Sequence, residues 1–298
     1  MFKIFPYKIG SASAKKLKEE LDGLFIKLKN SNYRYRDGHI VINWGNSHRP
    51  AVLEGVDMLN EPEAVAIATN KLTALEELAD NGVATAPFTT EIEIAEEWLS
   101  GGEKVFVRNE LNGHSGAGIE VVFNTLNQKT VERNLRIDAM ADELEALEEW
   151  DFADELRDKK DEAPELELPD APLYTMGLTN RGEYRVHVFQ GDVILYQKKS
   201  RRVDEETGEV VTAEGEDADI RNLASNWIYR TGNLKKLERI EELAVSAVEA
   251  LGLDFGAVDI IMDNEGNVFV LEVNTAPGLG NTETLEAYCN AFKTLEDE

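Results

Sequence analysis

The chain has 298 residues, 42% of them hydrophobic, which suits two or three domains with buried cores rather than one. Its formal net charge of −27 argues against a general nucleic-acid binder, because acidic surfaces repel phosphate. The same charge fits a protein with a basic partner and a protein from a salt-adapted host equally well. A single cysteine, Cys289, and the lack of any apolar run near the roughly 18 residues of a membrane span lead us to expect a cytoplasmic protein without an internal disulfide.

The elements expected before residue 125 alternate between strands and helices. They are a strand (2–7), a helix (13–30), a strand (39–45), helical segments (61–80 and 93–102) and two strands (104–109 and 118–123). The first three predict a small α/β unit, with Ser11 or Ser13 as the cap of its helix.

Residues 125–170 have a different composition. Fourteen Asp or Glu stand against three Lys or Arg over 141–170, yet Leu and aromatic residues recur at helical spacing. The pattern predicts a helical hairpin that turns near Trp150–Phe152. It is either a solvated arm or a lid or docking arm for a basic acceptor.

Beyond residue 171 the pattern returns to extended segments with one long helix. They are an extended segment (172–178), a hairpin (183–202) that turns at 190–192, a helix (234–253) and a final hairpin (254–279).

The final hairpin carries oxygen-bearing side chains on one of its two faces. If residues 263–266 form the turn, so that Met262 faces Asn267, one face is wholly apolar, made of Val258, Ile260, Met262, Phe269, Leu271 and Val273. The other face gathers Asp259, Glu272 and Asn274. Such a set of oxygen ligands suits a hard cation such as Mg²⁺. The alternative is a solvated sheet face.

Two further features are typical of phosphate binding. The loop over 112–119 is rich in glycine, so its backbone N–H groups can approach phosphates, although an ordinary hairpin loop has the same composition. Basic residues lie in or beside apolar strands and suggest a polyanion pocket, although each alone can be a surface charge. They are Lys71, Arg108, Arg185, Lys198, Lys199, Arg201 and Arg221.

Together these segments resemble the ATP-grasp superfamily, and more closely its RimK-like branch of amino-acid and peptide ligases. The resemblance covers about residues 60–298 apart from the acidic segment over 125–170, hereafter called the acidic arm. It rests on the segments "NKLTALEELADNGVATAP", "VFVRNELNGHSGAGI", "PLYTMGL", "EYRVHVF", "IRN", "VDIIM" and "LEVNTAPG", in that order.

The resemblance implies nucleotide-binding roles for residues that match family motifs. Lys71 matches the first lysine on the ATP phosphates. Arg108 stands where the family usually has a second lysine, which keeps the charge but replaces a compact ammonium with a planar fork. The phosphate-covering loop includes His114, Ser115, Gly116 and Gly118. Tyr174, Thr175 and Met176 resemble the hinge that holds adenine, without the acidic position of some relatives, and Glu183 matches the acid that binds ribose.

The resemblance also implies the groups near the reaction. Asp259, Glu272 and Asn274 match the ligands of Mg²⁺, with Mn²⁺ as an alternative metal. The residues around the γ-phosphate and the acyl group match Arg185, Lys198 or Lys199, Arg221 and Asn222.

The implied architecture is α+β: two α+β subdomains clasping ATP, at 67–172 and 173–298, preceded by a small α/β domain at 1–66. The implied activity is ADP-forming ligation of a carboxylate to an amine, which includes a basic peptide or protein among its possible acceptors. The rivals are a small-molecule kinase and a non-catalytic nucleotide-binding module. No membrane or nucleic-acid partner is expected, and no residue has the pattern of a covalent nucleophile.

Overall fold

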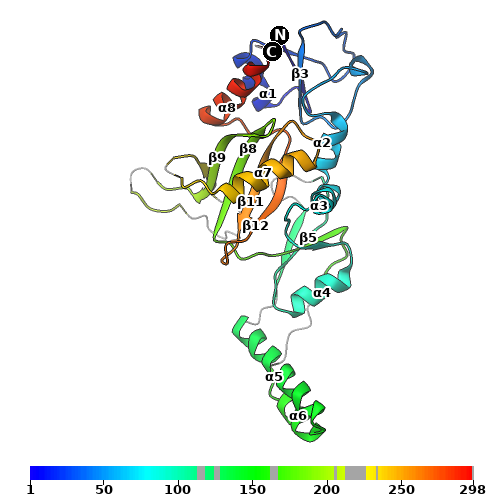
Figure 1. Cartoon of the computed structure of the whole chain (residues 1–298), viewed down its shortest axis with the longest axis vertical. Helices are drawn as coiled ribbons and strands as arrows, with labels where there is room; N and C mark the ends of the chain where they lie inside the picture. The colour runs from blue at the N-terminus through cyan, green and yellow to red at the C-terminus, as the bar shows by residue number, and fades with distance from the viewer. Residues whose placement is uncertain are drawn as a thin grey trace. The chain divides into compact units, whose positions relative to one another are not determined.

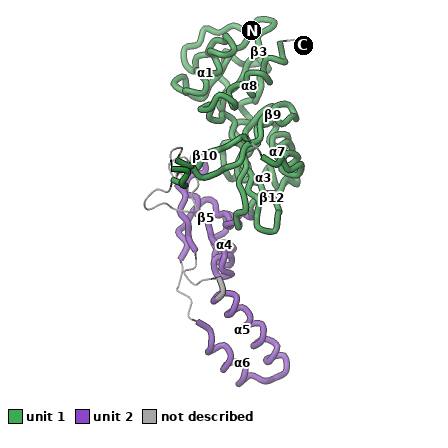
Figure 2. The backbone as a smooth tube through the Cα atoms, turned by 90° about the vertical axis from the view of Figure 1, so that its left-hand side faces the viewer, with its two compact units in different colours: residues 1–86, 114–116, 179–298 green, residues 87–113, 117–178 purple. Residues whose placement is uncertain are grey.

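The computed structural model describes residues 1–112, 118–123, 128–161, 167–204, 207–211, 226–232 and 234–296 (Figure 1). The chain divides into two compact units. One holds Met1–Ala86 and Thr179–Glu298, and the other holds Pro87–Gly113 and Ala117–Leu178 (Figure 2). Both units combine helices with separate sheets, as the predicted α+β class requires. No helix within the described ranges is long and apolar enough to cross a membrane.

A three-stranded parallel sheet forms the N-terminal part of the first unit. Its order is β2-β1-β3, with β1 at Phe2–Pro6, β2 at Leu24–Phe25 and β3 at Ile40–Trp44. Helix α1 (Ala12–Glu20) begins at Ser11, whose Oγ accepts a hydrogen bond from the backbone N of Ala14 at 3.3 Å.

The predicted helix over 13–30 was too long at its C-terminal end. Asp22 has φ 46°, and the backbone N of Gly23 donates to the carbonyl of Lys18 at 2.8 Å, which closes the helix. The chain then pairs with β1 as the short strand β2, in place of further helical turns.

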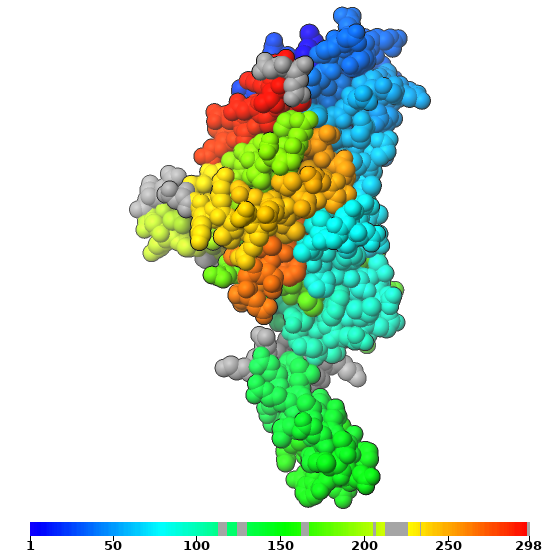
Figure 3. Space-filling model, viewed as in Figure 1, coloured from blue at the N-terminus to red at the C-terminus, as the bar shows by residue number. Residues whose placement is uncertain are grey.

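The larger sheet of this unit has five antiparallel strands in the order β10-β9-β8-β11-β12. They are β8 (Gly182–Phe189), β9 (Asp192–Arg201), β10 (Trp227–Arg230), β11 (Phe255–Met262) and β12 (Val268–Asn274). One face packs apolar side chains against α7 (Glu238–Ala250), with α2 (Pro62–Thr69) and α3 (Lys71–Asp80) beside it. In the space-filling view α7 forms the outer surface over this side of the sheet (Figure 3).

The opposite face of the same sheet is covered at one end by α8 (Thr282–Lys293). Phe189 and Phe255 pack there with Tyr288 and Phe292 of α8 and with Trp44 of β3. His187 lies beneath α8, 3.1 Å from Tyr288 Oη and 3.0 Å from Gln197 Oε1 through its two ring nitrogens. Short 3₁₀ turns at Ala51–Leu53 and Thr294–Glu296 complete the unit.

The β11–β12 hairpin has a different register from the predicted one. Met262 pairs with Val268 rather than with Asn267, and Ile260 pairs with Val270. The predicted apolar face was therefore wrong on β12: Val268 and Val270 occupy it in place of Phe269 and Leu271.

A β-bulge at Leu271 then restores the alignment of the acids. Ile260 pairs with Val270, but the next residue, Asp259, pairs with Glu272, so Leu271 has no partner across the ladder. Without the bulge, Glu272 would pair with Val258 and face α7. The bulge instead places Glu272 directly across from Asp259.

The second unit contains a four-stranded sheet in the order β4-β7-β5-β6. Its strands are β4 (Phe88–Thr89), β5 (Val105–Arg108), β6 (Ile119–Val122) and β7 (Leu173–Met176). Helix α4 (Ile92–Ser100) contributes Ala95 and Leu99 to a small core with Val105, Val107 and Tyr174.

The acidic segment forms the predicted helical hairpin. Its helices are α5 (Gln128–Ala146) and α6 (Trp150–Arg157), so the turn lies at 147–149, slightly earlier than expected. Ala141 and Ala153 are fully buried, and Arg157 of α6 binds Asp142 of α5 at 2.8 Å. Alanines at the contact and cations paired with acids allow a hairpin with this much negative charge to pack.

Candidate functional site

The charged face is the open part of the five-stranded sheet on the side away from α7. Strand alternation brings side chains of β8, β9, β10, β11 and β12 to this face, and Lys71 reaches it from the first turn of α3. The described residues that form it are Lys71, Glu183, Arg185, Lys199, Tyr229, Asp259, Glu272 and Asn274.

Arg185 and Asp259 form a largely buried ion pair on the charged face. They stand opposite each other on β8 and β11, and Arg185 Nε and Nη2 donate to the two carboxylate oxygens of Asp259 at 2.6 Å each. The guanidinium also lies 4.2 Å from the centre of the Tyr229 ring, and Tyr229 Oη donates to Asp259 Oδ1 at 3.3 Å. This bidentate pair fixes the positions of both side chains.

Glu272 is held by Lys71 and Asn274. Lys71 Nζ forms an ion pair with Glu272 Oε2, and Asn274 Nδ2 donates to Glu272 Oε1 at 3.2 Å. Lys71 is positioned by the start of α3, where Asn70 Oδ1 accepts hydrogen bonds from the backbone N of Leu72 and Thr73.

A third pair joins Glu183 of β8 to Lys199 of β9. Lys199 Nζ lies 2.7 Å from Glu183 Oε2, and Asn180 Nδ2 donates to Glu183 Oε1 at 2.6 Å. Lys199 also lies 5.5 Å from the centre of the Tyr229 ring. The charged face therefore alternates cations and carboxylates, with Tyr229 between two of the cations.

The surroundings shift the pKa values of these groups. Burial lowers the pKa of Arg185, but the adjacent Asp259 carboxylate raises it by more, so the guanidinium stays charged. Burial raises the pKa of Asp259 against the attraction of Arg185. Burial would also raise the pKa of Glu272, but the Lys71 ammonium outweighs it and lowers the value to about 2. Glu272 is thus a carboxylate at neutral pH.

The donor set of this face suits a hard divalent cation. Asp259 and Glu272 face each other across the ladder, and Asn274 touches Glu272, which gives two carboxylates and one amide on a rigid hairpin. Mg²⁺ is typically held by one or two carboxylates together with phosphate oxygens and water. No group of three or more His, Cys, Asp or Glu arranged for a metal exists in the part of the chain that the structure describes. A metal here would therefore depend on this smaller set and on a bound phosphate.

Sequence reasoning missed Tyr229 and Asn180. Tyr229 pairs with Lys199 on the neighbouring strand and contacts both Arg185 and Asp259. A signal for Tyr229 did exist in the sequence. The run "WIYR" is typical of a strand, and strand alternation predicts that Tyr229 and Trp227 lie on the same face of it. Asn180 lies in the polar segment before β8, which gave no such signal.

The structure separates Lys198 from the charged face. Lys198 pairs with Tyr184, whose ring faces the α7 side, so alternation sends Lys198 to the opposite face from Lys199. Its ammonium lies 5.7 Å from the centre of the Tyr184 ring. Of the two adjacent lysines, only Lys199 reaches Glu183 and Tyr229.

The predicted hinge residues and Arg108 lie in the second unit. Arg108 Nε donates to Thr175 Oγ1 at 3.3 Å. Tyr174 is 1% exposed, and its hydroxyl accepts from the backbone N of Ala171 and donates to the carbonyl of Pro169, both at 2.9 Å. The Tyr174 ring is therefore part of the core, which leaves the backbone of this segment and the half-buried side chain of Met176 for a base.

The predicted phosphate loop is only partly described. Gly118 has φ 70°, and a Cβ there would lie 2.9 Å from the side chain of Glu110, so this turn requires glycine. His114, Ser115 and Gly116 lie outside the described residues, as do Arg221 and Asn222.

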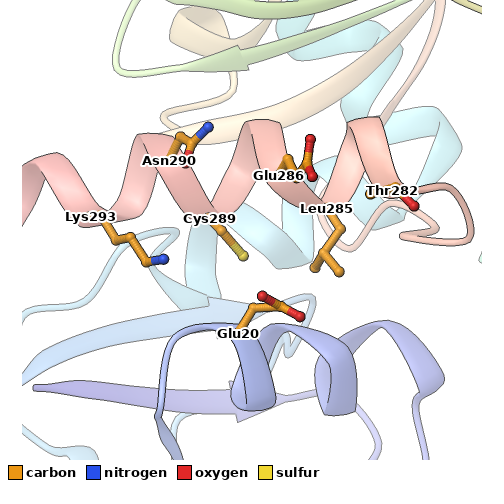
Figure 4. A pocket seen from close by; sticks show the side chains of 7 residues that line it. All are labelled: Glu20, Thr282, Leu285, Glu286, Cys289, Asn290 and Lys293. Atoms are coloured by element: carbon orange, nitrogen blue, oxygen red, sulfur yellow. The ribbon is translucent and has the colours of Figure 1, made fainter.

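Cys289 lies away from the charged face, as the sequence suggested. It projects from α8 toward Glu20 of α1 and lines a cavity of about 120 Å³ with Leu285 and Lys293 (Figure 4). Burial raises the pKa of its thiol to about 11, so the unreactive protonated form dominates at neutral pH.

Two sequence comparisons match parts of this chain, and the family model among them covers the C-terminal third, where most of the charged face lies. The family model described as D-ala D-ala ligase C-terminus matches residues 191–293, which include β10, β11, β12 and α8. A probable alpha-L-glutamate ligase of Enterobacter sp. (strain 638) is 40% identical over 79 residues, 25% of this chain and 25% of that protein. The chain thus matches only about a quarter of the length of this curated relative.

Solved structures match nearly the whole chain at low sequence identity. The ATP-grasp ligase PsnB, complexed with minimal precursor, Mg and ADP, superimposes with a TM-score of 0.61 and 15% identity, over 99% of this chain and 97% of the other. The D-alanine–D-alanine ligase of Bacillus anthracis, complexed with ATP, gives a TM-score of 0.55 and 13% identity, over 98% and 91%. These matches confirm the predicted ATP-grasp fold, and the sequence matches confirm the resemblance to its RimK-like ligases.

Proposed function

We propose that this ATP-grasp protein joins a carboxylate to an amine through an acyl-phosphate and releases ADP and phosphate. The observation that carries the proposal is the charged face, where Asp259 and Glu272 oppose each other and Lys71, Arg185 and Lys199 surround them. Two carboxylates with one amide suit a phosphate-bound divalent metal, and the surrounding cations suit a polyphosphate.

Each residue of the charged face has a distinct part in this proposal. Asp259, Glu272 and Asn274 would hold Mg²⁺, or Mn²⁺ in its place. A bound divalent ion supplies positive charge to the phosphate oxygens. Lys71 and Lys199 offset the negative charge that spreads over the transferred phosphoryl group as the substrate carboxylate attacks it. Arg185 orients the deeply placed Asp259 through two hydrogen bonds, and Glu183 accepts hydrogen bonds from hydroxyl groups of the ribose.

The second step of the proposed reaction, attack of the amine on the acyl-phosphate, depends more on the orientation of the two reactants than on acid–base chemistry. An amine that attacks the acyl-phosphate displaces phosphate and forms the amide, and holding the two reactants together supplies much of the rate. No cysteine, serine or histidine of the described residues lies on the charged face as a covalent nucleophile. The reducing cytoplasm remains our proposed location, in keeping with the single buried thiol of Cys289.

The test of this proposal is the dependence of ADP release on the substrates. We expect full release only when a carboxylate and an amine are both present, with ADP and phosphate as the products. A mass-spectrometric screen of cell extract with enzyme and ATP should find products formed by loss of one water. Release with a single alcohol would indicate the rival kinase, no release would indicate a binding module, and AMP with pyrophosphate would mean adenylation.

The acidic arm supports a basic peptide or protein as the acceptor. Leu147, Trp150 and Phe152 at its tip expose 72%, 58% and 60% of their surface, amid Glu148, Glu149 and Asp151. Exposed aromatic residues with a charged rim are typical of protein interaction sites. A solved complex of PsnB contains the precursor peptide PsnA2 together with AMPPNP, which supports a peptide as a substrate of this fold.

Neutralising three acids of the arm is expected to raise KM for a basic acceptor by about three- to tenfold at low ionic strength, because long-range attraction is lost. The variant is Glu143→Gln/Glu148→Gln/Glu149→Gln, in which all three side chains are exposed. Steady-state kinetics should show that the KM for ATP and kcat hardly change, and raised salt should remove the difference from the unmodified protein.

The matched control carries the same change of charge in the same unit, on α4. It is Glu93→Gln/Glu96→Gln/Glu97→Gln, again with exposed side chains. An equal rise in KM for both triple variants would indicate a general effect of net charge and would remove the docking role of the arm.

A further inference from the structure

A second group of cations lies on the α7 side of the five-stranded sheet, opposite the charged face. A cavity of about 410 Å³ opens there, lined by Arg181, Lys198, Lys235 and Arg239, with Tyr184 and Met262 in its wall. Its volume falls within the range of about 300–1,000 Å³ that is typical of small-molecule sites. None of the described residues that line it is acidic.

The four cations come from separate segments that the fold brings together. Arg181 precedes β8 and is fixed by its backbone N, which donates to the carbonyl of Met262 at 2.9 Å. Lys198 reaches the cavity because it pairs with Tyr184 on the α7 side of the sheet. Arg239 lies in the first turn of α7, with Nη2 3.4 Å from Met262 Sδ. Lys235 lies in the segment just before α7.

Among the residues that the structure describes, these cations have no counter-charge of their own. None of the four has an ion-pair partner within the described residues, whereas the neighbouring Lys236 binds Glu241 at 3.6 Å. The chain has 58 acidic against 31 basic residues, so acids are abundant elsewhere. Four unpaired cations around one cavity repel each other, and a bound anion relieves that repulsion.

We propose that this cavity binds a small polyanion with two or more negative groups, a polyphosphate or a polycarboxylate. The planar forks of Arg181 and Arg239 suit bidentate contacts with phosphate or carboxylate, and Lys198 and Lys235 add compact charges. The proposal is independent of the ligase activity, because the residues assigned to the nucleotide in the first unit lie on the other face of the sheet. Lys198 therefore has this anion as its ligand rather than the nucleotide.

Calorimetric titration tests the site with two probes, tripolyphosphate and citrate, on the full chain without nucleotide. We expect at least one of them to bind, and the tighter one assigns the class of anion. Lys235→Gln should weaken binding by about tenfold, the loss expected for one charge-assisted contact. The matched control is Lys236→Gln, the same change at the adjacent exposed lysine, and its affinity should stay within about twofold because Lys236 already has a partner.

The pattern of lysine acetylation identifies the face of the sheet on which the anion binds. With the probe bound, mass spectrometry should find Lys198 and Lys235 protected and Lys236 as reactive as in the free protein, whether or not a polyphosphate also protects Lys71 and Lys199 on the charged face. Three results would overturn the proposal: no binding of either probe, equal weakening by the two lysine variants, or protection of Lys71 and Lys199 with no protection of Lys198 and Lys235. The last result would mean that the anion occupies the charged face.

Discussion

Replacing Glu272 by glutamine is expected to lower the rate of ADP release by about two orders of magnitude or more while the protein stays folded. The change removes one of only two carboxylates from the proposed metal site, and the metal's stabilisation of phosphoryl transfer is worth several kcal/mol. Glutamine has nearly the same shape, and the Glu272 side chain is 36% exposed, so the unpaired Lys71 can be solvated. Mg²⁺ should also be needed at a higher concentration.

The measurement is ADP release as a function of Mg²⁺, with thermal unfolding as the check on folding. Glu241→Gln is the matched control, because it breaks a glutamate–lysine pair of α7 that lies outside the charged face. That variant should keep its activity. If Glu272→Gln released ADP at nearly the unmodified rate and at the same Mg²⁺ concentration, Glu272 would not be a metal ligand.

Alternation along strands predicted that the oxygen ligands of the final hairpin share a face, but it did not predict the whole charged face, because Tyr229 was missed. Asp259, Glu272 and Asn274 were expected on one face of the hairpin, and the structure places them together. Arg185 was also expected near them, and it pairs with Asp259 across the ladder. The placement of Asp259 and Arg185 follows from the two-residue period of a strand, whereas Glu272 reaches this face in the observed register because of the bulge at Leu271.

The register of the hairpin could not be predicted in the same way. The bulge at Leu271 lies beside Val270, whose backbone N donates to the carbonyl of Ala84 at 2.8 Å. A segment almost two hundred residues earlier in the chain therefore pairs with the outer edge of β12, which a reading of the hairpin by itself does not include. The apolar residues Phe269 and Leu271 fit either register, so the local pattern alone does not distinguish the two registers.

The separation of Lys198 from Lys199 has a similar cause. Both lysines follow the apolar run of β9, and either could match the family's position near the γ-phosphate. The choice depends on the pairing of β9 with β8, where the register shifts between His187 and Val188. That irregularity determines which lysine faces Glu183. The resemblance implied either Lys198 or Lys199, and the pairing of β9 with β8 places Lys199 on the charged face.

Replacing Arg185 by methionine is expected to reduce the free energy of unfolding by about 3–5 kcal/mol, because it leaves the buried Asp259 without its partner. The Asp259 side chain is only 11% exposed, and two of its hydrogen bonds come from Arg185. Tyr229 would keep one weak bond to Oδ1 at 3.3 Å, which cannot replace a bidentate guanidinium. Urea unfolding measures the loss.

A second substitution separates the charge from the packing of this pair. Arg185→Met/Asp259→Asn removes the isolated charge, so it should recover a large part of the stability that the single variant loses, while ADP release stays low in both. Asp259→Asn alone leaves Arg185 charged but 20% exposed, and it should cost less than Arg185→Met. A double variant no more stable than Arg185→Met would mean that the guanidinium stabilises the sheet through its stacking on Tyr229, 4.2 Å away, rather than through Asp259. In that case Tyr229→Leu should reproduce the loss by itself.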